Sequence, residues 1–152
     1  MLRSVPFLLS LAALPLAFAR RADERVRRWP PPTLGGREMP FAEAVQVGDL
    51  LFLSGQLGNV PGTLELVPGG IAAETRQTLA NIDAALARCG CNLGDLVKVT
   101  VMLADMSEWA AMNEAYVAGF AGHPLPARSS FGTSGLALGA RLEMEAVAAA
   151  PK

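Results

Sequence analysis

Residues 72–103, AAETRQTLANIDAALARCGCNLGDLVKVTVML, decide the fold. In the first half, Leu79, Ile82 and Leu86 recur three or four residues apart, which is the period of a helix with one apolar face. Gly90 follows where a C-terminal cap belongs, so we predict a helix over Ala72–Cys89. In the second half, every other residue is apolar: Val97, Val99, Val101 and Leu103. This alternation predicts a strand that is covered on one face.

The segments on either side add a hairpin before this unit and a helix after it. Ala44–Val47 and Leu50–Leu53 are apolar runs that flank a Gly-Asp turn, which predicts two paired strands. Asp105 and Glu108 have the spacing of a helix-capping box. Four large residues then repeat at three and four positions and predict the buried stripe of a second helix: Trp109, Met112, Tyr116 and Phe120.

Two further strands are predicted near the C-terminus, over Arg128–Thr133 and Ala140–Ala149. The resulting order, ββαβαββ, predicts an α+β fold in which two helices cover one face of a mixed sheet. In the last strand, apolar residues alternate with Glu143 and Glu145, so its two faces differ in polarity. The second face of the sheet is then either solvated or buried by another chain.

The N-terminal residues have the features of a targeting segment. Arg3 precedes an almost wholly apolar run over residues 5–18, and Ala17–Ala19 has the small-x-small form of a cleavage site. We predict a signal peptide over residues 1–19, cleaved after Ala19, and therefore an exported protein, either periplasmic or secreted. An uncleaved membrane anchor is the alternative, but the run is shorter than the roughly 20 residues that span a bilayer.

Residues 20–38 differ in composition from the segments on both sides. They include five arginines before residue 30, three prolines at 30–32 and two glycines at 35–36. This composition disfavours both helix and sheet. We predict a basic, Pro/Gly-rich extended leader here, followed by a single domain over residues 39–150.

Composition excludes several functional classes. The formal net charge of −1 and the pI of about 5.8 provide no positive field to attract nucleic acid. Cys89 and Cys91 are too few and too closely spaced for a structural zinc site, and His123 is the only histidine. A disulfide across one intervening residue would be strained, so we expect two partly buried cysteines at a helix end. We expect no metal.

Two residues in the C-terminal part carry the candidate chemistry. Arg128 stands at the start of a strand, where a rigidly held guanidinium binds a carboxylate through two parallel hydrogen bonds. Glu143, on the polar face of the next strand, accepts a proton from water if its surroundings tune its pKa. A structural ion pair between Arg128 and Glu143 explains the same pattern, and the residues alone leave both alternatives open.

Several segments, in order along the chain, resemble the RidA/YjgF family. They are FLSGQ at 52–56, NI at 81–82, MNEAY at 112–116, PARSSF at 126–131 and LEM at 142–144. The resemblance covers roughly residues 39–149. Several ordered motifs at compatible spacing are far more specific than any one of them.

The resemblance implies a chorismate-mutase-like homotrimer with ligand clefts between its subunits. It also implies hydrolysis of reactive enamines and imines of small carboxylates to ketoacids and ammonia, without a cofactor. Arg128 would bind the substrate carboxylate, and Glu143 would orient or activate water. The remaining cleft residues, by position, would be Phe41, Ser54, Gly55, Asn113 and Ser130.

The chain departs from the family at Phe41, where many members have Tyr, at Ser130, where Cys is frequent, and at Ala137, where Leu-Pro is usual. The Phe41 difference and the predicted export leave open a non-catalytic trimer that binds a stable carboxylate metabolite or acts as a chaperone. A ribonuclease or translation-inhibitor role is attached to some relatives, but acidity and the absence of a histidine pair argue against it. A serine hydrolase is disfavoured because neither Ser54 nor Ser134 lies in a G-x-S-x-G turn.

Overall fold

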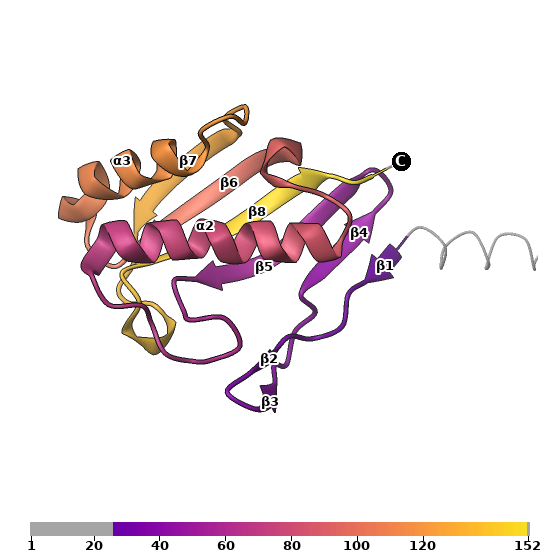
Figure 1. The fold of residues 1–152 in the computed structure, drawn as a ribbon, viewed down its shortest axis with the longest axis horizontal. Coiled ribbons are helices and arrows are strands. Elements are labelled where there is room, and N and C mark those ends of the chain that lie inside the picture. Colours follow the sequence, from indigo (N-terminus) through magenta and orange to yellow (C-terminus); the bar gives the residue numbers. More distant parts are fainter. Residues whose placement is uncertain (1–25, 152) are drawn as a thin grey trace, which may run out of the picture.

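The computed structural model describes residues 26–151, which form a six-stranded sheet, a two-stranded hairpin and two long helices (Figure 1). The predicted signal peptide lies outside these residues. The strands are β1 (Val26–Arg28), β2 (Thr33–Leu34), β3 (Arg37–Glu38), β4 (Ala44–Val47), β5 (Leu50–Leu57), β6 (Leu96–Leu103), β7 (Ala127–Gly132) and β8 (Leu142–Ala149). The helices are α2 (Gly70–Arg88) and α3 (Trp109–Gly119), with 3₁₀ turns at Leu93–Asp95, Met106–Glu108 and Ala137–Gly139.

The main sheet has the strand order β1-β4-β5-β8-β6-β7. Its strands pair antiparallel except for β6 and β7. These two are parallel because α3 carries the chain back to the end of the sheet at which β6 begins. From β4 to β8 the elements follow the predicted order ββαβαββ. The prediction of an α+β fold with a mixed sheet is confirmed.

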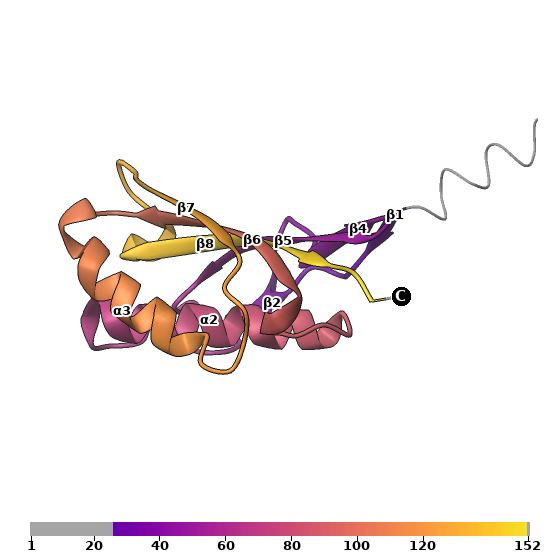
Figure 2. The ribbon, with the colours of Figure 1, turned by 90° about the horizontal axis from the view of Figure 1, so that it is seen from above.

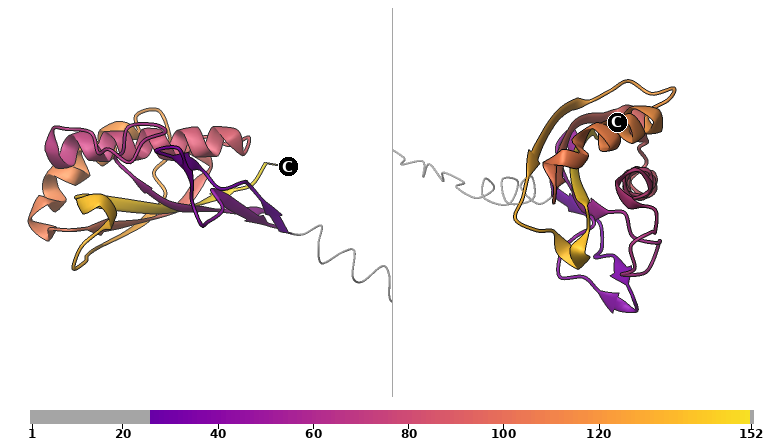
Figure 3. Two further views of the ribbon diagram at one scale, coloured as in Figure 1. Left: turned by 90° about the horizontal axis from the view of Figure 1, so that it is seen from below. Right: turned by 90° about the vertical axis from the view of Figure 1, so that its left-hand side faces the viewer.

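Both helices lie on the same side of the sheet. Figure 2 shows α2 and α3 together below the strands, and the end-on view in Figure 3 shows no helix of residues 26–151 on the other face. The core forms between the helices and the strand residues that point toward them. Its fully buried side chains include Ile82 and Leu86 from α2, Val99 and Val101 from β6, and Leu142 and Met144 from β8. No helix within residues 26–151 has the length and apolar content needed to cross a membrane.

Helix α2 follows the prediction closely and ends one residue earlier. Cys89 is its C-terminal cap, and Gly90 adopts a positive φ of 82°, a conformation that glycine accepts without steric cost. On the side that faces β5, the Asn81 side-chain amide donates hydrogen bonds to the carbonyl oxygens of Leu57 and Asn59 over 2.9 and 3.0 Å. Asn81 therefore fixes the loop that leaves β5.

The second helix begins later than predicted. Asp105 caps the 3₁₀ turn Met106–Glu108 by accepting the Ser107 N–H over 2.8 Å, and α3 starts only at Trp109. Glu108 does not close a capping box, because its carboxylate pairs with Arg141. Trp109 is 39 % exposed, so its predicted place in the buried stripe is wrong.

Strand β6 contains an irregularity that the alternating pattern concealed. The pairing with β8 shifts register between Leu96 and Lys98, so Leu96 turns inward and Val97 turns out. Val97 is 44 % exposed, although the alternation placed it in the core. A bulge of one residue reverses the face on which a side chain lies, and alternation alone does not reveal it.

The predicted leader is wrong from Val26 onward. Strand β1 pairs with β4 and extends the main sheet, and β2 and β3 form a hairpin around two glycines at positive φ. Trp29, between β1 and β2, is 7 % exposed, and its Nε1 donates a hydrogen bond to the Arg88 carbonyl over 3.2 Å. The pairing of β1 with β4 and the buried tryptophan thus attach a segment of unfavourable composition to the domain.

We expect Trp29→Ala to lower the free energy of unfolding by about 3–5 kcal/mol, because it empties a buried site and removes a hydrogen bond to α2. Urea denaturation followed by circular dichroism measures this change. Arg28→Ala, at an exposed position of β1, is the control and should change the stability by less than about 0.5 kcal/mol. Equal effects of both substitutions would show that Trp29 does not hold the segment in place.

Candidate active site

Arg128 lies on the edge strand β7, and its side chain points to the helix-covered side of the sheet. Its register partner on β6 is the fully buried Val99, so both residues face α3. Nη2 of Arg128 donates a hydrogen bond to Asn113 Oδ1 over 2.7 Å. The guanidinium carbon lies 4.5 Å from the ring centre of Tyr116 and 5.8 Å from that of Trp109. Three residues of one helix thus hold the guanidinium through uncharged contacts.

Tyr116 is the buried member of this group. It is 2 % exposed, and its hydroxyl has no hydrogen-bond partner among residues 26–151. Burial raises the pKa of Tyr116 to about 12, while the positive charge of Arg128 acts in the opposite direction. The phenol is therefore neutral at physiological pH, and it places no negative charge beside Arg128.

Glu143 lies on β8 and points to the opposite face of the sheet. Its neighbours Leu142 and Met144 are fully buried beneath the helices, and the pleat of the strand directs Glu143 the other way. Burial raises the pKa of the Glu143 carboxyl above its usual range, and the negative charge of Glu145 on the same face raises it further. A carboxylate with a raised pKa is a stronger base.

Gly55 makes room for this carboxylate. A Cβ placed on Gly55 would come within 1.9 Å of Oε1 of Glu143. Close by, Ser54 Oγ donates a hydrogen bond to the Ala42 carbonyl over 2.7 Å, which fastens the segment that carries Phe41 to the end of β5. The Phe41 side chain is 44 % exposed. Ser54 therefore has a structural bond, and Phe41 is free to contact a ligand.

The predicted site residues fall into two groups. The first group lies beside α3 at the edge of the sheet and comprises Arg128, Asn113 and Ser130. The second group lies around the end of β5 and the start of β8 and comprises Phe41, Ser54, Gly55 and Glu143. Strand β6 separates β7 from β8, and the side chains of Arg128 and Glu143 point to opposite faces.

The alternative of a structural ion pair between Arg128 and Glu143 is therefore wrong within one chain. The ion pairs among residues 26–151 are formed by Arg88 with Glu43 and by Arg141 with Glu74 and Glu108. Strand order alone had allowed Arg128 and Glu143 to be neighbours. The register of β6 between β7 and β8 decides that they are not.

A buried carboxylate fixes the start of β8. Glu74 on α2 is 5 % exposed and accepts the backbone N–H of Arg141 over 2.9 Å. The Arg141 guanidinium donates to Glu108 Oε1 over 2.6 Å, which connects this point to the turn before α3. The network ends two residues before Glu143. Sequence reasoning missed it, because its three members belong to segments that no common periodicity links.

Sequence reasoning also placed Trp109 and Tyr116 in the core and missed their contact with Arg128. A signal was available, because Trp109, Asn113 and Tyr116 stand at positions i, i+4 and i+7 and share one face of a helix. The spacing did not reveal which strand lies opposite that face.

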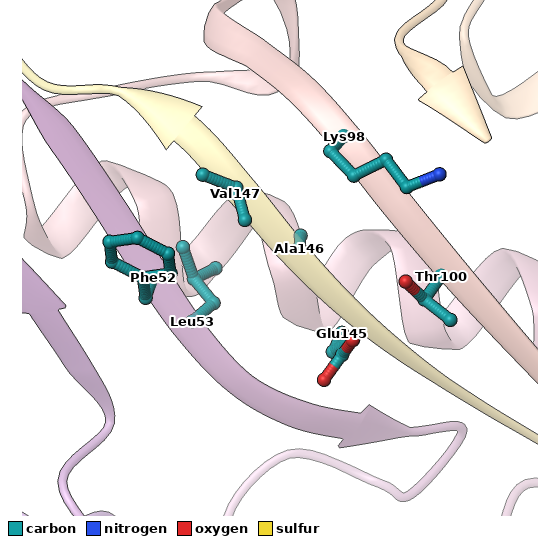
Figure 4. Close-up of a pocket in the computed structure, with 7 residues that line it drawn as sticks. All are labelled: Phe52, Leu53, Lys98, Thr100, Glu145, Ala146 and Val147. Carbon is teal, nitrogen blue, oxygen red and sulfur yellow. The ribbon is translucent and has the colours of Figure 1, made fainter. Parts of the chain in front are cut away.

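The open face of the sheet is partly apolar. Four large side chains on it are between 43 % and 47 % exposed: Val47, Leu50, Phe52 and Phe131. Figure 4 shows a pocket on this face with Phe52 of β5 on one side, Lys98 and Thr100 of β6 on the other, and Glu145 of β8 between them. Apolar side chains around a few polar ones are typical of a surface that another chain buries.

No group of three or more His, Cys, Asp or Glu within residues 26–151 is arranged to hold a metal ion. Cys89 and Cys91 are buried free thiols at the C-terminal end of α2, as predicted. Burial raises the pKa of Cys89 to about 11 and shifts the pKa of Cys91 in the same direction. Both stay protonated at neutral pH and are poor nucleophiles.

This geometry defines a class of protein. It is an α+β domain that holds an arginine at one edge of its sheet and a carboxylate on the open face. The family model described as endoribonuclease L-PSP matches residues 36–150. The chain belongs to this family, which is the RidA/YjgF family of the resemblance noted above.

Individual relatives agree with this assignment. The chain is 42 % identical to the mouse 2-iminobutanoate/2-iminopropanoate deaminase over 109 residues, which are 72 % of this chain and 80 % of that protein. It is 43 % identical to a RutC family protein of Pyrococcus horikoshii over 72 % of this chain and 86 % of that protein. The crystal structure of the Escherichia coli YjgF gene product superimposes with a TM-score of 0.73 at 30 % identity, covering 81 % of this chain and 98 % of that chain.

We expect Gly55→Ala to move the Glu143 carboxylate while leaving the fold intact, because the atom in conflict is the end of a flexible side chain. The free energy of unfolding, measured by thermal denaturation, should change by no more than about 1 kcal/mol. A crystal structure of the variant should show a different Glu143 rotamer. Gly48→Ala is not a suitable control, because Gly48 has a positive φ of 58°. Ala80→Gly, at an exposed position of α2, is the control for the crystal structure and should leave the Glu143 rotamer unchanged.

The raised pKa of Glu143 predicts a pH-dependent stability. The folded state binds the Glu143 proton more tightly than the unfolded state, so this stabilisation is complete below the usual pKa of about 4.5 and is lost as the pH rises through the raised value. Glu143→Gln should therefore melt at a higher temperature than the wild type at pH 7. Calorimetry from pH 4 to pH 8 should show the difference vanish at the acidic end. A difference independent of pH would contradict this.

Proposed function

We propose that this protein hydrolyses reactive imines and enamines of small carboxylates to ketoacids and ammonia. The observation that carries the proposal is an arginine held only by uncharged groups, together with a carboxylate whose pKa is raised by burial. Relatives about 40 % identical are named 2-iminobutanoate/2-iminopropanoate deaminase. A structure titled TdcF with bound serine, 31 % identical with a TM-score of 0.70 over 82 % of this chain and 94 % of that chain, supports a ligand that bears a carboxylate.

In the proposed reaction, Arg128 binds the substrate carboxylate through its free N–H groups. Glu143 takes a proton from water as the water oxygen adds to the imine carbon, and returns that proton to the nitrogen. The hydroxyl proton of the resulting adduct then moves to the nitrogen in the same way, the C–N bond breaks, and ammonia leaves the ketoacid. An enamine enters this sequence after it tautomerises to the imine. Imines hydrolyse in water without a catalyst, so positioning water is a sufficient task for so few residues.

The two groups of site residues point to an active site that forms between chains. Arg128 and Glu143 of one chain point away from each other, so a substrate that contacts both needs Arg128 of one copy and Glu143 of another. The partly apolar open face gives such copies a surface to bury. We propose a homotrimer in which each cleft combines the Arg128 group of one subunit with the Glu143 group of its neighbour.

We also propose that the protein is exported, with cleavage after Ala19, because the N-terminal residues have the composition of a signal peptide. A substrate outside the cytoplasm would then come from an exported enzyme that oxidises or dehydrates amino acids. Mass spectrometry of the mature N-terminus in a secreting host measures the cleavage site.

Two alternatives compete with this proposal. The substitution of Phe41 for a hydroxyl-bearing residue favours a protein that binds a carboxylate without turnover. The description of the family model favours a ribonuclease, but the chain has a single histidine and a net charge of −1, which give it neither a histidine pair nor a positive field for RNA. Tight binding without ammonia release would support the carboxylate-binding protein, and cleavage of RNA would support the ribonuclease.

We expect the protein to hydrolyse imines generated in situ by an amino-acid oxidase faster than buffer does, as followed by semicarbazone formation. Arg128→Ala should lower kcat/KM by about 30-fold or more, because the substrate carboxylate loses its charged partner. Glu143→Gln should lower kcat by about 100-fold or more, because the base is lost. Arg76→Ala, an exposed arginine on α2, is the matched control and should retain activity.

Mixing these two inactive variants tests the shared cleft. If each cleft takes Arg128 and Glu143 from different copies, a trimer reassembled from equal amounts of Arg128→Ala and Glu143→Gln should regain activity in about one cleft in four. If every cleft uses one chain only, no activity returns. Light scattering of the wild type measures the trimer itself, and a stable monomer would rule out this site.

A further inference from the structure

Trp109 is the large residue of the predicted α3 stripe that does not belong to the core. Its side chain is 39 % exposed, whereas Met112, Tyr116 and Phe120 are each at most 2 % exposed. Keeping such an apolar surface in water gives no stability to the single chain. Burial in the core therefore does not account for a tryptophan at this position.

The place of Trp109 relative to Arg128 suggests another role. Tyr116 covers the guanidinium from the buried side at 4.5 Å, and Asn113 accepts one hydrogen bond from Nη2. The Trp109 ring, 5.8 Å from the guanidinium carbon, is the most exposed of the three residues. The exposed part of this ring is therefore available to the substituent of a carboxylate that binds to Arg128.

We propose that Trp109 is a specificity-determining residue that binds the substrate side chain and selects imines with large apolar or aromatic side chains over 2-iminopropanoate. This inference rests on the proposed function, because it assigns the side-chain end of the same carboxylate site. The chemistry that fits an exposed indole is a flat or branched apolar group, which removes both surfaces from water.

Trp109 also contacts Arg128. Its support of the guanidinium can be separated from its proposed contact with the substrate side chain. Contact with the guanidinium supports every carboxylate to the same extent, because all of them use Arg128. Contact with the side chain changes only the ratio between substrates. A change in the ratio of kcat/KM for two imines therefore reports the proposed role, and a uniform change reports only the support of Arg128.

The protein carries its own reporter for a binding test. The sequence has two tryptophans, and Trp29 is buried near β1, at the edge of the sheet opposite to β7. Trp29→Phe keeps an apolar ring in the core and leaves Trp109 as the only fluorescent indole. Stable carboxylates serve as probes, namely 3-phenylpropanoate and propanoate.

We expect 3-phenylpropanoate to change the Trp109 fluorescence of the Trp29→Phe protein and to bind about fivefold or more tightly than propanoate, the size of effect that one aromatic pair produces. In Trp109→Leu, calorimetry should show the two affinities to be within about twofold of each other. Equal affinities in the Trp29→Phe protein, or an unchanged ratio in Trp109→Leu, would overturn the assignment of Trp109. Failure of both carboxylates to bind would instead contradict the carboxylate site and with it the proposed function.

Turnover gives the second readout, with imines made from phenylalanine and from alanine. Trp109→Leu should lower the ratio of kcat/KM for the phenylalanine-derived imine to kcat/KM for the alanine-derived imine about fivefold, over and above the loss that both imines share through Arg128. The Trp29→Phe protein should keep the wild-type ratio. A proportionate loss on both imines would assign Trp109 to the support of Arg128 only, and the proposal would be wrong.

Discussion

The pleat of the sheet, together with helices on only one of its faces, is the constraint on which the rest of this structure depends. Neighbouring side chains of a strand point to opposite faces, so apolar residues of β6 and β8 fill the core while the residues between them reach the open face. The same alternation directs Arg128 toward α3 and Glu143 away from it. The core and the division of the candidate site thus have one geometric origin.

This division has an electrostatic consequence. Had Arg128 and Glu143 paired within the chain, each would have neutralised the other. Instead, Arg128 is held by an amide and two aromatic rings, and Glu143 lies over a glycine near a second carboxylate. None of these contacts supplies an opposite charge, so both groups keep their electrostatic interaction available for a ligand.

Hydrogen bonds from polar side chains to the backbone hold the segments that carry the Glu143 part of the candidate site. Glu74 is buried, and its bond to the Arg141 N–H fixes the chain two residues before Glu143. Asn81 fixes the loop that follows the Gly55 segment, and Ser54 fastens the segment that carries Phe41. Polar bonds from buried side chains to backbone groups have defined directions, which apolar packing lacks. They orient the backbone around the open-face site, which has no helix above it.

The sequence by itself determined the helices and the strands from β4 to β8, and it indicated the candidate site residues, because periodicity and short motifs are local properties of the chain. It misplaced Val97, Trp109 and residues 26–38, since a bulge, an exposed helix start and a single buried tryptophan depend on partners distant in sequence. Tertiary structure alone decided that β6 lies between β7 and β8, and therefore that Arg128 and Glu143 face opposite ways. Strand order and register are set by contacts across the whole sheet, which no local pattern encodes.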